Sequence, residues 1–210
     1  MNLFFSPLAC SLASRIALYE AQSPARFTQV DLKQKQVICG GDFRAINAMG
    51  QVPALQLDDG TVITENTAVL QFIAAKAPEK NLAPVDPTAR AQLQQWLGFI
   101  ATELHKAVFV PLLDRQASDA VKDYAREKVT ARLAVLEKYL HGRETLLDQF
   151  SIADAYLATI LNWASATNVD LKQWPSVHAY HRRMLERPTI ARAVAEEFAM
   201  YREEQARQKA

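Results

Sequence analysis

The sequence predicts a small α/β domain followed by an all-helical domain. In residues 1–78, short apolar runs that alternate like strands are interleaved with segments of helical spacing. In residues 88–210, apolar residues recur at steps of three and four, which is typical of amphipathic helices. Several prolines lie close together between these two parts, so we expect a linker at residues 79–87.

Within the first domain we expect the element order β-α-β-α-β-β-α. Asp58-Asp59-Gly60 lies between two apolar runs, which indicates a β-hairpin, and Gly40-Gly41 breaks the chain before a short helix. The expected strands are Leu3–Phe5, Phe27–Leu32, Ala54–Leu57 and Thr61–Ile63, and the expected helices are Ser11–Ala21, Asp42–Asn47 and Asn66–Ala77.

The second domain shows one helix signal after another. Ser151 followed by Asp154 is the pattern of a capping box, which opens a helix. Pro175 and Pro188 suit the first turns of two short terminal helices. Gly142 can end the helix that is indicated by the apolar residues from Val121 to Leu140. The two remaining helices are indicated by the apolar series Leu93, Leu97, Ile100, Leu104 and Val108 and by the series Val121, Tyr124, Val129, Leu133, Leu136 and Leu140.

The composition argues against several classes of protein. Half of the 210 residues are hydrophobic, so the chain can bury a core without disulfides or metal ions. The 24 Lys and Arg residues nearly balance the 23 Asp and Glu residues, which argues against a nucleic-acid partner. We find no secretory signal and no apolar run of the ~20 residues that a membrane span needs. Two cysteines form neither a disulfide framework nor a metal site, so we expect a protein of the reducing cytoplasm.

Cys10 lies where the first strand passes into the first helix. The unpaired N–H groups at a helix start carry partial positive charge, which favours a thiolate or a bound anion. A buried cysteine that only packs in the core is also compatible with this position. Cys10 is not half of a Cys-x-x-Cys pair, because Pro7 and Ala13 stand at the spacing that a partner would need.

Two further segments have features that could bind a short peptide. Pro53 enters a strand, and a cis Val52–Pro53 bond would turn the Val52 backbone toward an extended peptide. In Thr64-Glu65-Asn66-Thr67, the N–H groups of a helix start favour a ligand carboxylate, and Glu65 could hold an amine. The alternatives are an ordinary turn proline and plain capping of the helix by Thr64 or Asn66.

A helix-start cysteine, an X-Pro strand entry and a Glu-Asn helix start, in this order, resemble the thioredoxin-like domain of the glutathione transferases. The residue sequences of several motifs are similar to those of the bacterial beta class, and the similarity extends over nearly the whole chain. These motifs are SLAS after Cys10, VDLKQK at 30–35, INAMGQVPALQLDDG at 46–60, TENTAV at 64–69, IATELHK at 100–106 and FSIADAYL at 150–157. The resemblance implies a cytoplasmic, homodimeric enzyme that transfers glutathione to small hydrophobic electrophiles and needs no metal.

The resemblance also implies a role for each matching residue. Cys10 would face the glutathione sulfur, Lys35 the glycyl carboxylate, and the Val52 backbone the cysteinyl unit. The γ-glutamyl head would be held by Glu65 and Asn66. A second contact region, which can reach the glutathione of the partner subunit, would consist of Thr102, Glu103, Leu104 and His105.

Two aromatic residues carry further expectations. His105 would be catalytic by assisting proton movement near the sulfur, because histidine titrates near neutral pH. Trp163 would lie near the pocket for the electrophile. The alternatives are a histidine packed between helices and a core tryptophan, just as Lys35 is alternatively a solvated surface lysine. Three positions depart from the family: Asn66 replaces a small residue, Gly98 replaces an asparagine, and Cys39 matches no functional position.

Two other functions remain open at this point. A single cysteine can form a reversible mixed disulfide with glutathione, so the chain could be a glutathione-dependent redox enzyme with weak conjugating activity. Some proteins of this fold only bind ligands and do not catalyse transfer. The joint presence of Cys10, Lys35 and Glu65 favours a protein that binds glutathione over one that does not.

Overall fold

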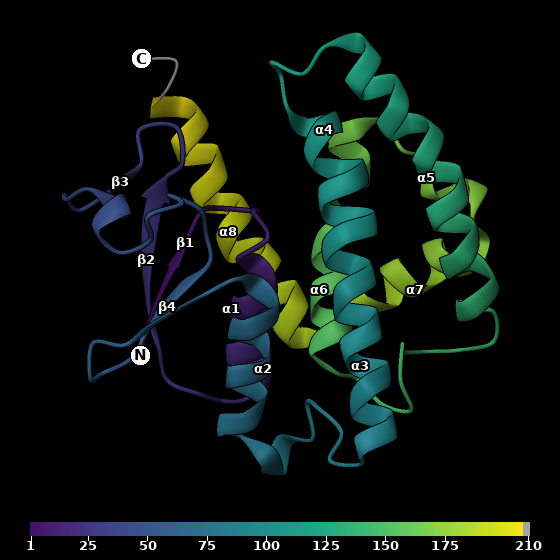
Figure 1. Ribbon diagram of the computed structural model, residues 1–210, viewed down its shortest axis with the longest axis horizontal. Helices are drawn as coiled ribbons and strands as arrows, with labels where there is room; N and C mark the ends of the chain where they lie inside the picture. The colour runs from purple at the N-terminus through teal and green to yellow at the C-terminus, as the bar shows by residue number, and fades with distance from the viewer. Residues whose placement is uncertain (208–210) are drawn as a thin grey trace. The chain divides into compact units, whose positions relative to one another are not determined.

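The computed structural model describes residues 1–207, and it groups the chain into two units by packing. The first unit comprises Met1–Leu82 together with the C-terminal segment that begins at Pro188, and the second comprises Ala83–Arg187. The expected division instead places everything from residue 88 onward in the helical domain. The difference concerns the final helix, α8 (Pro188–Arg207), which packs on α1 (Leu12–Glu20) of the first unit (Figure 1).

The first unit is built on a five-stranded mixed sheet with the order β3-β2-β1-β4-β5. The central strand β1 runs parallel to β2 and antiparallel to β4, so that Leu3 lies opposite both Phe27 and Leu55. The outer pairs β2–β3 and β4–β5 are antiparallel, and β4–β5 is the expected hairpin. The strands are β1 (Asn2–Phe5), β2 (Arg26–Asp31), β3 (Gln36–Val37), β4 (Ala54–Gln56) and β5 (Val62–Thr64).

Alternation along β1 supplies apolar side chains to the layers on either side of the sheet. Leu3 and Phe5 are almost fully buried, and α1 packs against both β1 and α2 (Asn66–Lys76). Phe4 belongs to a different cluster, with its ring 5.7 Å from that of Phe43. Val52 packs in the same cluster, together with Val30, Val37 and Ala54. The apolar core therefore anchors the segment that leads into β4.

The segment between β2 and β4 differs from the expectation. The helix expected at 42–47 is a single 3₁₀ turn, Phe43–Ala45, whose start is capped by the Asp42 carboxylate accepting from the Arg44 N–H. The short strand β3 was not expected from the alternation pattern. Gly40 and Gly41 both have a positive φ, and the Val37 N–H donates to the Gly41 carbonyl oxygen. This tight turn pairs Val37 with Val30 of β2, and the 3₁₀ turn that follows ends at Ala45.

The second unit is helical, as expected. Its elements are α3 (Pro87–Phe99), a π-helical segment (Ile100–Phe109), α4 (Val110–Leu113), α5 (Asp119–Leu140), α6 (Ile152–Leu161), two 3₁₀ segments (Asn162–Thr167 and Leu171–Gln173) and α7 (Pro175–Glu186). The expected first-turn prolines are confirmed at the starts of α7 and α8, but α8 extends over 20 residues and is not short. The capping box of α6 is also confirmed, because Ser151 and Asp154 satisfy each other's backbone N–H groups.

The long helix that opens the second unit has a π-helical middle. At its end, the Val110 N–H donates to the carbonyl oxygen of His105, five residues back. The apolar spacing that predicts a helix here does not distinguish this pattern from an α-helix. The helical stretch Pro87–Leu113 contains an 18-residue window with a mean hydropathy of 1.3, so by length and composition it would also suit a membrane span. A core helix passes the same test, and its apolar side chains Leu93, Trp96, Leu97, Ile100, Leu104 and Val108 are buried in the second unit.

Candidate active site

Cys10 lies in the turn that connects β1 to α1. The Ser11 hydroxyl closes this turn by accepting from the Ser6 N–H at 3.2 Å and donating to the Ser6 carbonyl oxygen at 3.3 Å. The Ala13 N–H donates to the Cys10 carbonyl oxygen, so Cys10 directly precedes the regular turns of α1. Its side chain is half-buried, and its thiol is free of any disulfide. This is the helix-start position that the sequence predicts.

The Cys10 thiol meets the backbone of Val52. The Val52–Pro53 bond is cis, and the thiol donates to the Val52 carbonyl oxygen at 3.2 Å. The structure therefore brings together two residues that the sequence separates by 42 positions. The family resemblance assigns the backbone of Val52, to which this carbonyl group belongs, to the cysteinyl unit of glutathione.

Lys35 lies against the segment that precedes Val52. Its ammonium group donates to the Gly50 carbonyl oxygen at 2.9 Å. Gly50 has a φ of +58°, and an added Cβ there would approach the Lys35 side chain to 2.9 Å, so the stem of Lys35 depends on a glycine at this position. Asn47, which the sequence reasoning did not single out, holds the next carbonyl: its Nδ2 donates to the Gln51 oxygen at 2.6 Å.

Glu65 stands exposed at the start of α2, with its backbone in the left-handed region at φ +65°. Such a conformation is uncommon for a residue with a side chain and is often found at functional sites. No side chain of the described residues caps this end of α2, so plain capping by Thr64 or Asn66 is not what the structure shows. The first N–H groups of α2 are therefore not occupied by a capping side chain.

Asn66 faces inward from the same helix start. Its Oδ1 accepts from the Ser14 hydroxyl at 2.8 Å, and its Nδ2 donates to the Cys10 carbonyl oxygen at 3.2 Å. The amide thus ties α2 to α1 at Cys10 and is almost fully buried. Because the side chain is engaged within the protein, the expected contact of Asn66 with a γ-glutamyl head remains a prediction for its backbone.

The contacts of the first unit form a connected chain around Cys10. The Cys10 thiol bonds to the Val52 carbonyl, and the Lys35 ammonium group bonds to the carbonyl of Gly50, two positions earlier. On the other side, the Asn66 side chain bonds to the Cys10 carbonyl and so links Cys10 to the start of α2, beside Glu65. One end of this cluster offers a cation, the middle offers backbone groups, and the other end offers helix N–H groups with a carboxylate. This arrangement suits an extended, anionic peptide that carries an amino-acid head.

His105 is packed inside the second unit. Its Nδ1 lies 2.8 Å from the Tyr156 hydroxyl, and its ring forms a T-shaped contact with Trp163 at a centroid distance of 5.1 Å. Burial, aided by the positive charge of Lys106, lowers the pKa of His105 to about 4. The ring is therefore neutral at pH 7, which contradicts the expectation that His105 titrates near neutrality. Trp163 is half-buried and also contacts Phe109, at 6.3 Å between centroids.

The other residues of the expected second contact region have different surroundings. Glu103 forms a forked ion pair with Arg132 of α5, at 2.6 and 2.8 Å from one carboxylate oxygen. Leu104 is fully buried in the core. Thr102 is exposed, and its hydroxyl donates to the Gly98 carbonyl oxygen at 3.0 Å. Of these side chains, Thr102 is thus the most accessible to a partner or ligand.

The buried His105 and the half-buried His181 of the second unit predict a loss of stability in mild acid. His181 resembles His105, because burial, with a further contribution from His178, lowers its pKa to about 4. Below pH ~6.5 the unfolded rings take up protons while the folded rings stay neutral down to about pH 4, so stability is lost as the pH falls through this window. We expect each histidine to cost about 2 kcal/mol between pH 7 and pH 5.

Chemical denaturation of wild type and His105→Gln at pH 7 and pH 5 measures this effect. The variant should lose about 2 kcal/mol less than wild type on acidification. His141→Gln, at an exposed position, controls for the removal of a histidine. An equal loss in wild type and His105→Gln would show that His105 is not buried in its neutral form.

Gly98 predicts a gain of stability on substitution. It lies exposed in α3, and an added Cβ meets no atom within 4 Å. Because glycine is disfavoured in a helix interior, Gly98→Ala should raise the free energy of unfolding by about 0.5–1 kcal/mol. Urea denaturation measures this change. A loss of stability would mean that another surface packs against Gly98.

The described residues contain no group of three or more His, Cys, Asp or Glu side chains that could hold a metal ion. Cys39 is exposed beside Gly40 and Gly41, away from the bonds that define the Cys10 cluster. The candidate site is therefore made of Cys10, Lys35, Val52 and the Glu65–Asn66 helix start, with no metal centre identified in residues 1–207.

Comparison with known proteins bears out the family suggested by these motifs. Residues 9–76 match the model of the glutathione S-transferase N-terminal domain, and residues 99–188 match that of the C-terminal domain. The chain is 41% identical, over 94% of its length and 98% of the relative's, to glutathione S-transferase GstA of Escherichia coli O157:H7. It is 35% identical, over 88% and 93% of the two chains, to glutathione S-transferase GST-4.5 of Xanthomonas campestris.

Solved structures agree with the same assignment. BphK, a bacterial GST solved as a ternary complex, superposes with a TM-score of 0.91 at 42% identity, covering 94% of this chain and 99% of that one. The beta-class enzyme of Sphingomonas chungbukensis superposes with a TM-score of 0.89 at 41% identity, covering 94% and 98%. The expected fold, a thioredoxin-like domain followed by a helical domain, is confirmed. The chain belongs to the glutathione S-transferase family, and it resembles bacterial beta-class members.

Proposed function

We propose that this glutathione transferase conjugates reduced glutathione to small hydrophobic electrophiles, and that it works as a homodimer in the cytoplasm. The observation that carries the proposal is the cluster around Cys10, where a cation, the Val52 backbone and an uncapped helix start follow one another. A sphingomonad glutathione S-transferase, solved in complex with glutathione, is 41% identical to this chain and supports the same ligand.

The site complements glutathione unit by unit. The Lys35 ammonium pairs with the glycyl carboxylate, and the Val52 backbone pairs with the cysteinyl unit as an added strand would. The first N–H groups of α2 bind the γ-glutamyl carboxylate, and Glu65 holds the γ-glutamyl amine. In this arrangement the glutathione sulfur lies at Cys10, next to the start of α1.

The chemistry is a nucleophilic displacement by the glutathione thiolate. A free thiol has a pKa of about 8.5, so partial positive charge at a helix start increases the fraction of thiolate at neutral pH. The Cys10 thiol, which donates to the Val52 oxygen in the structure, can donate to that thiolate instead. With an aryl halide, the thiol proton passes to solvent, a carbon–sulfur bond forms, and the halide leaves with the electrons of the broken bond.

The second unit offers aromatic groups for an apolar electrophile. We place Trp163 at that pocket, since it is half-buried among aromatic rings. A neutral His105, bonded to Tyr156, can act as a hydrogen-bond partner, and it is not a cationic proton donor at pH 7. Thr102 is the side chain of the second contact region that we expect to face the glutathione of the partner subunit.

The test is the rate of glutathione conjugation to a chlorodinitrobenzene in wild type, Cys10→Ala and the control Cys39→Ala. We expect saturable conjugation in wild type and in Cys39→Ala. A rate that collapses in Cys10→Ala, while glutathione still binds, makes Cys10 integral to sulfur activation; a rate that survives assigns activation to the helix start. Absence of conjugation in wild type overturns the proposal and leaves the redox or ligand-binding alternative.

A further inference from the structure

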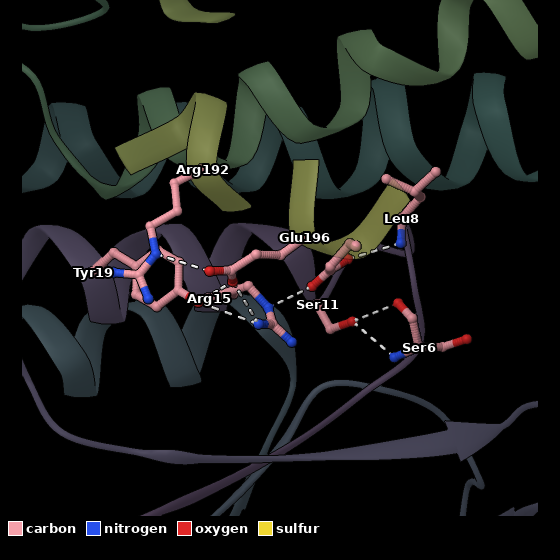
Figure 2. A network of polar contacts seen from close by, with 8 residues as sticks. Ser6, Leu8, Ser11, Arg15, Tyr19, Arg192 and Glu196 are labelled. Carbon is pink, nitrogen blue, oxygen red and sulfur yellow. Dashed lines mark hydrogen bonds and ion pairs between the residues drawn. The ribbon is translucent and has the colours of Figure 1, made fainter. Parts of the chain in front are cut away.

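A buried carboxylate from the last helix contacts the turn that carries Cys10. Glu197 of α8 is fully buried, and its Oε2 accepts from the Leu8 N–H at 2.7 Å. Its Oε1 accepts from Arg15 Nε at 2.8 Å. Figure 2 shows the surroundings of this contact: Ser6, Leu8 and Ser11 belong to the turn, and Arg15 also bonds to Glu196 (Figure 2). The contact joins positions 189 residues apart in the chain.

The hydrogen bond from the Leu8 N–H to Glu197 holds Leu8 in an unfavourable backbone conformation. Leu8 has a φ of +60°, in the region that residues with a Cβ rarely adopt. Two positions later comes Cys10, and the Ser11–Ser6 bonds close the same turn from its other end. The acceptor that holds the Leu8 N–H therefore also fixes where the Cys10 side chain starts.

The charges around Glu197 explain how its carboxylate is retained inside the protein. Arg15 of α1 is almost fully buried, with its guanidinium carbon 4.3 Å from the ring centre of Phe5 and 4.0 Å from that of Phe27. Arg15 Nη1 also donates to Glu196 and to Tyr19. Burial raises the pKa of Glu197 to about 7, although Arg15 and the Leu8 N–H counteract this effect. A carboxylate in so unfavourable a place needs both of these donors.

We propose that Glu197 is a positioning residue for Cys10. Through the Leu8 N–H it holds the Ser6–Ser11 turn in the conformation that places the thiol at the Val52 carbonyl, and through Arg15 it fixes the first turns of α1. The consequence for glutathione rests on the proposed function, whereas the consequence for the Cys10 thiol does not. Glu196 is the natural comparison, because it also binds Arg15 but makes no bond to the Cys10 turn.

The test measures the alkylation rate of Cys10 by iodoacetamide in a Cys39→Ser background. Glu197→Gln keeps the shape of the side chain, but an amide NH₂ group cannot accept a hydrogen bond, so one of the two donors loses its partner. We expect the Cys10 rate to change by about fivefold or more, the scale of one lost hydrogen bond. Glu196→Gln should leave the rate within about twofold of the background.

Stability and glutathione affinity complete the test. Denaturant midpoints are measured for both variants, because a purely structural role for Glu197 would lower stability and leave the Cys10 rate unchanged. Where Glu197→Gln does not fold, Glu197→Asp retains the charge near Arg15 while its shorter side chain withdraws from Leu8. An unchanged Cys10 rate, or failure of both variants to fold, overturns the positioning role. Alkylation needs no glutathione, so a changed rate without detectable conjugation would count against the proposed function alone.

Discussion

Replacing Glu65 by glutamine is expected to weaken glutathione binding by about tenfold or more, which is the scale of one charge-assisted hydrogen bond. Glutamine has nearly the same shape and meets the same backbone conformation at φ +65°, so the variant removes the charge and little else. The proposed partner is the γ-glutamyl amine. Titration calorimetry at pH 7 measures the dissociation constant.

Glu79 supplies the matched control for this experiment. It is also exposed, and it belongs to the 3₁₀ turn Pro78–Lys80 after α2. Glu79→Gln should therefore bind glutathione like wild type. Unchanged affinity in Glu65→Gln would refute the placement of the γ-glutamyl head at the start of α2.

Replacing Asp154 by alanine is expected to lower the free energy of unfolding by about 3–5 kcal/mol. Its carboxylate is fully buried and accepts from the Leu146 N–H at 2.9 Å, the Ser151 N–H at 2.9 Å, the Ser151 hydroxyl at 3.0 Å and the Tyr180 hydroxyl at 2.8 Å. Without the carboxylate, these donors stay buried and lose their acceptor. Equilibrium denaturation at pH 7 measures the loss.

Asp170 offers a comparison at the surface. Its carboxylate caps the 3₁₀ turn Leu171–Gln173 by accepting from the Lys172 N–H. Asp170→Ala should cost about 1 kcal/mol, as the loss of an ordinary cap does. If Asp154→Ala costs no more than Asp170→Ala, the four bonds to Asp154 contribute far less than their burial implies.

Local signals in the sequence were enough for most of the fold. The Asp58-Asp59-Gly60 turn predicted its hairpin, and the Ser151–Asp154 pattern predicted the start of α6; both depend on residues close together in the chain. The π-helical course of Ile100–Phe109 was not predictable, because apolar spacing is shared by both kinds of helix. The assignment of α8 was also missed, since the partner of Glu197 is Arg15, 182 positions earlier.

In the candidate site, too, the sequence predicts local features but not contacts between residues that are far apart in the chain. The motifs singled out Cys10, Lys35, Val52 and Glu65, and the structure brings Cys10 into contact with Val52. The burial of Asn66 and His105 could not be read from the sequence, because it depends on Ser14 and Tyr156 on other helices. Glu197 lies in none of the motifs, and Asn47 lies in the motif at 46–60 without being assigned a role there; each acts on the site through a backbone group of another residue.

The central claim is that glutathione binds along the Cys10 cluster in one orientation, with its glycyl carboxylate at Lys35 and its amine at Glu65. Calorimetric titration of wild type, Lys35→Met and Glu65→Gln with glutathione, its C-terminal amide and its N-acetyl derivative tests this pairing as a set of cycles. Lys35→Met should weaken glutathione but not the C-terminal amide, and Glu65→Gln should weaken glutathione but not the N-acetyl derivative. If each variant weakens all three ligands equally, or if the two pairings are exchanged, the account of the site is wrong.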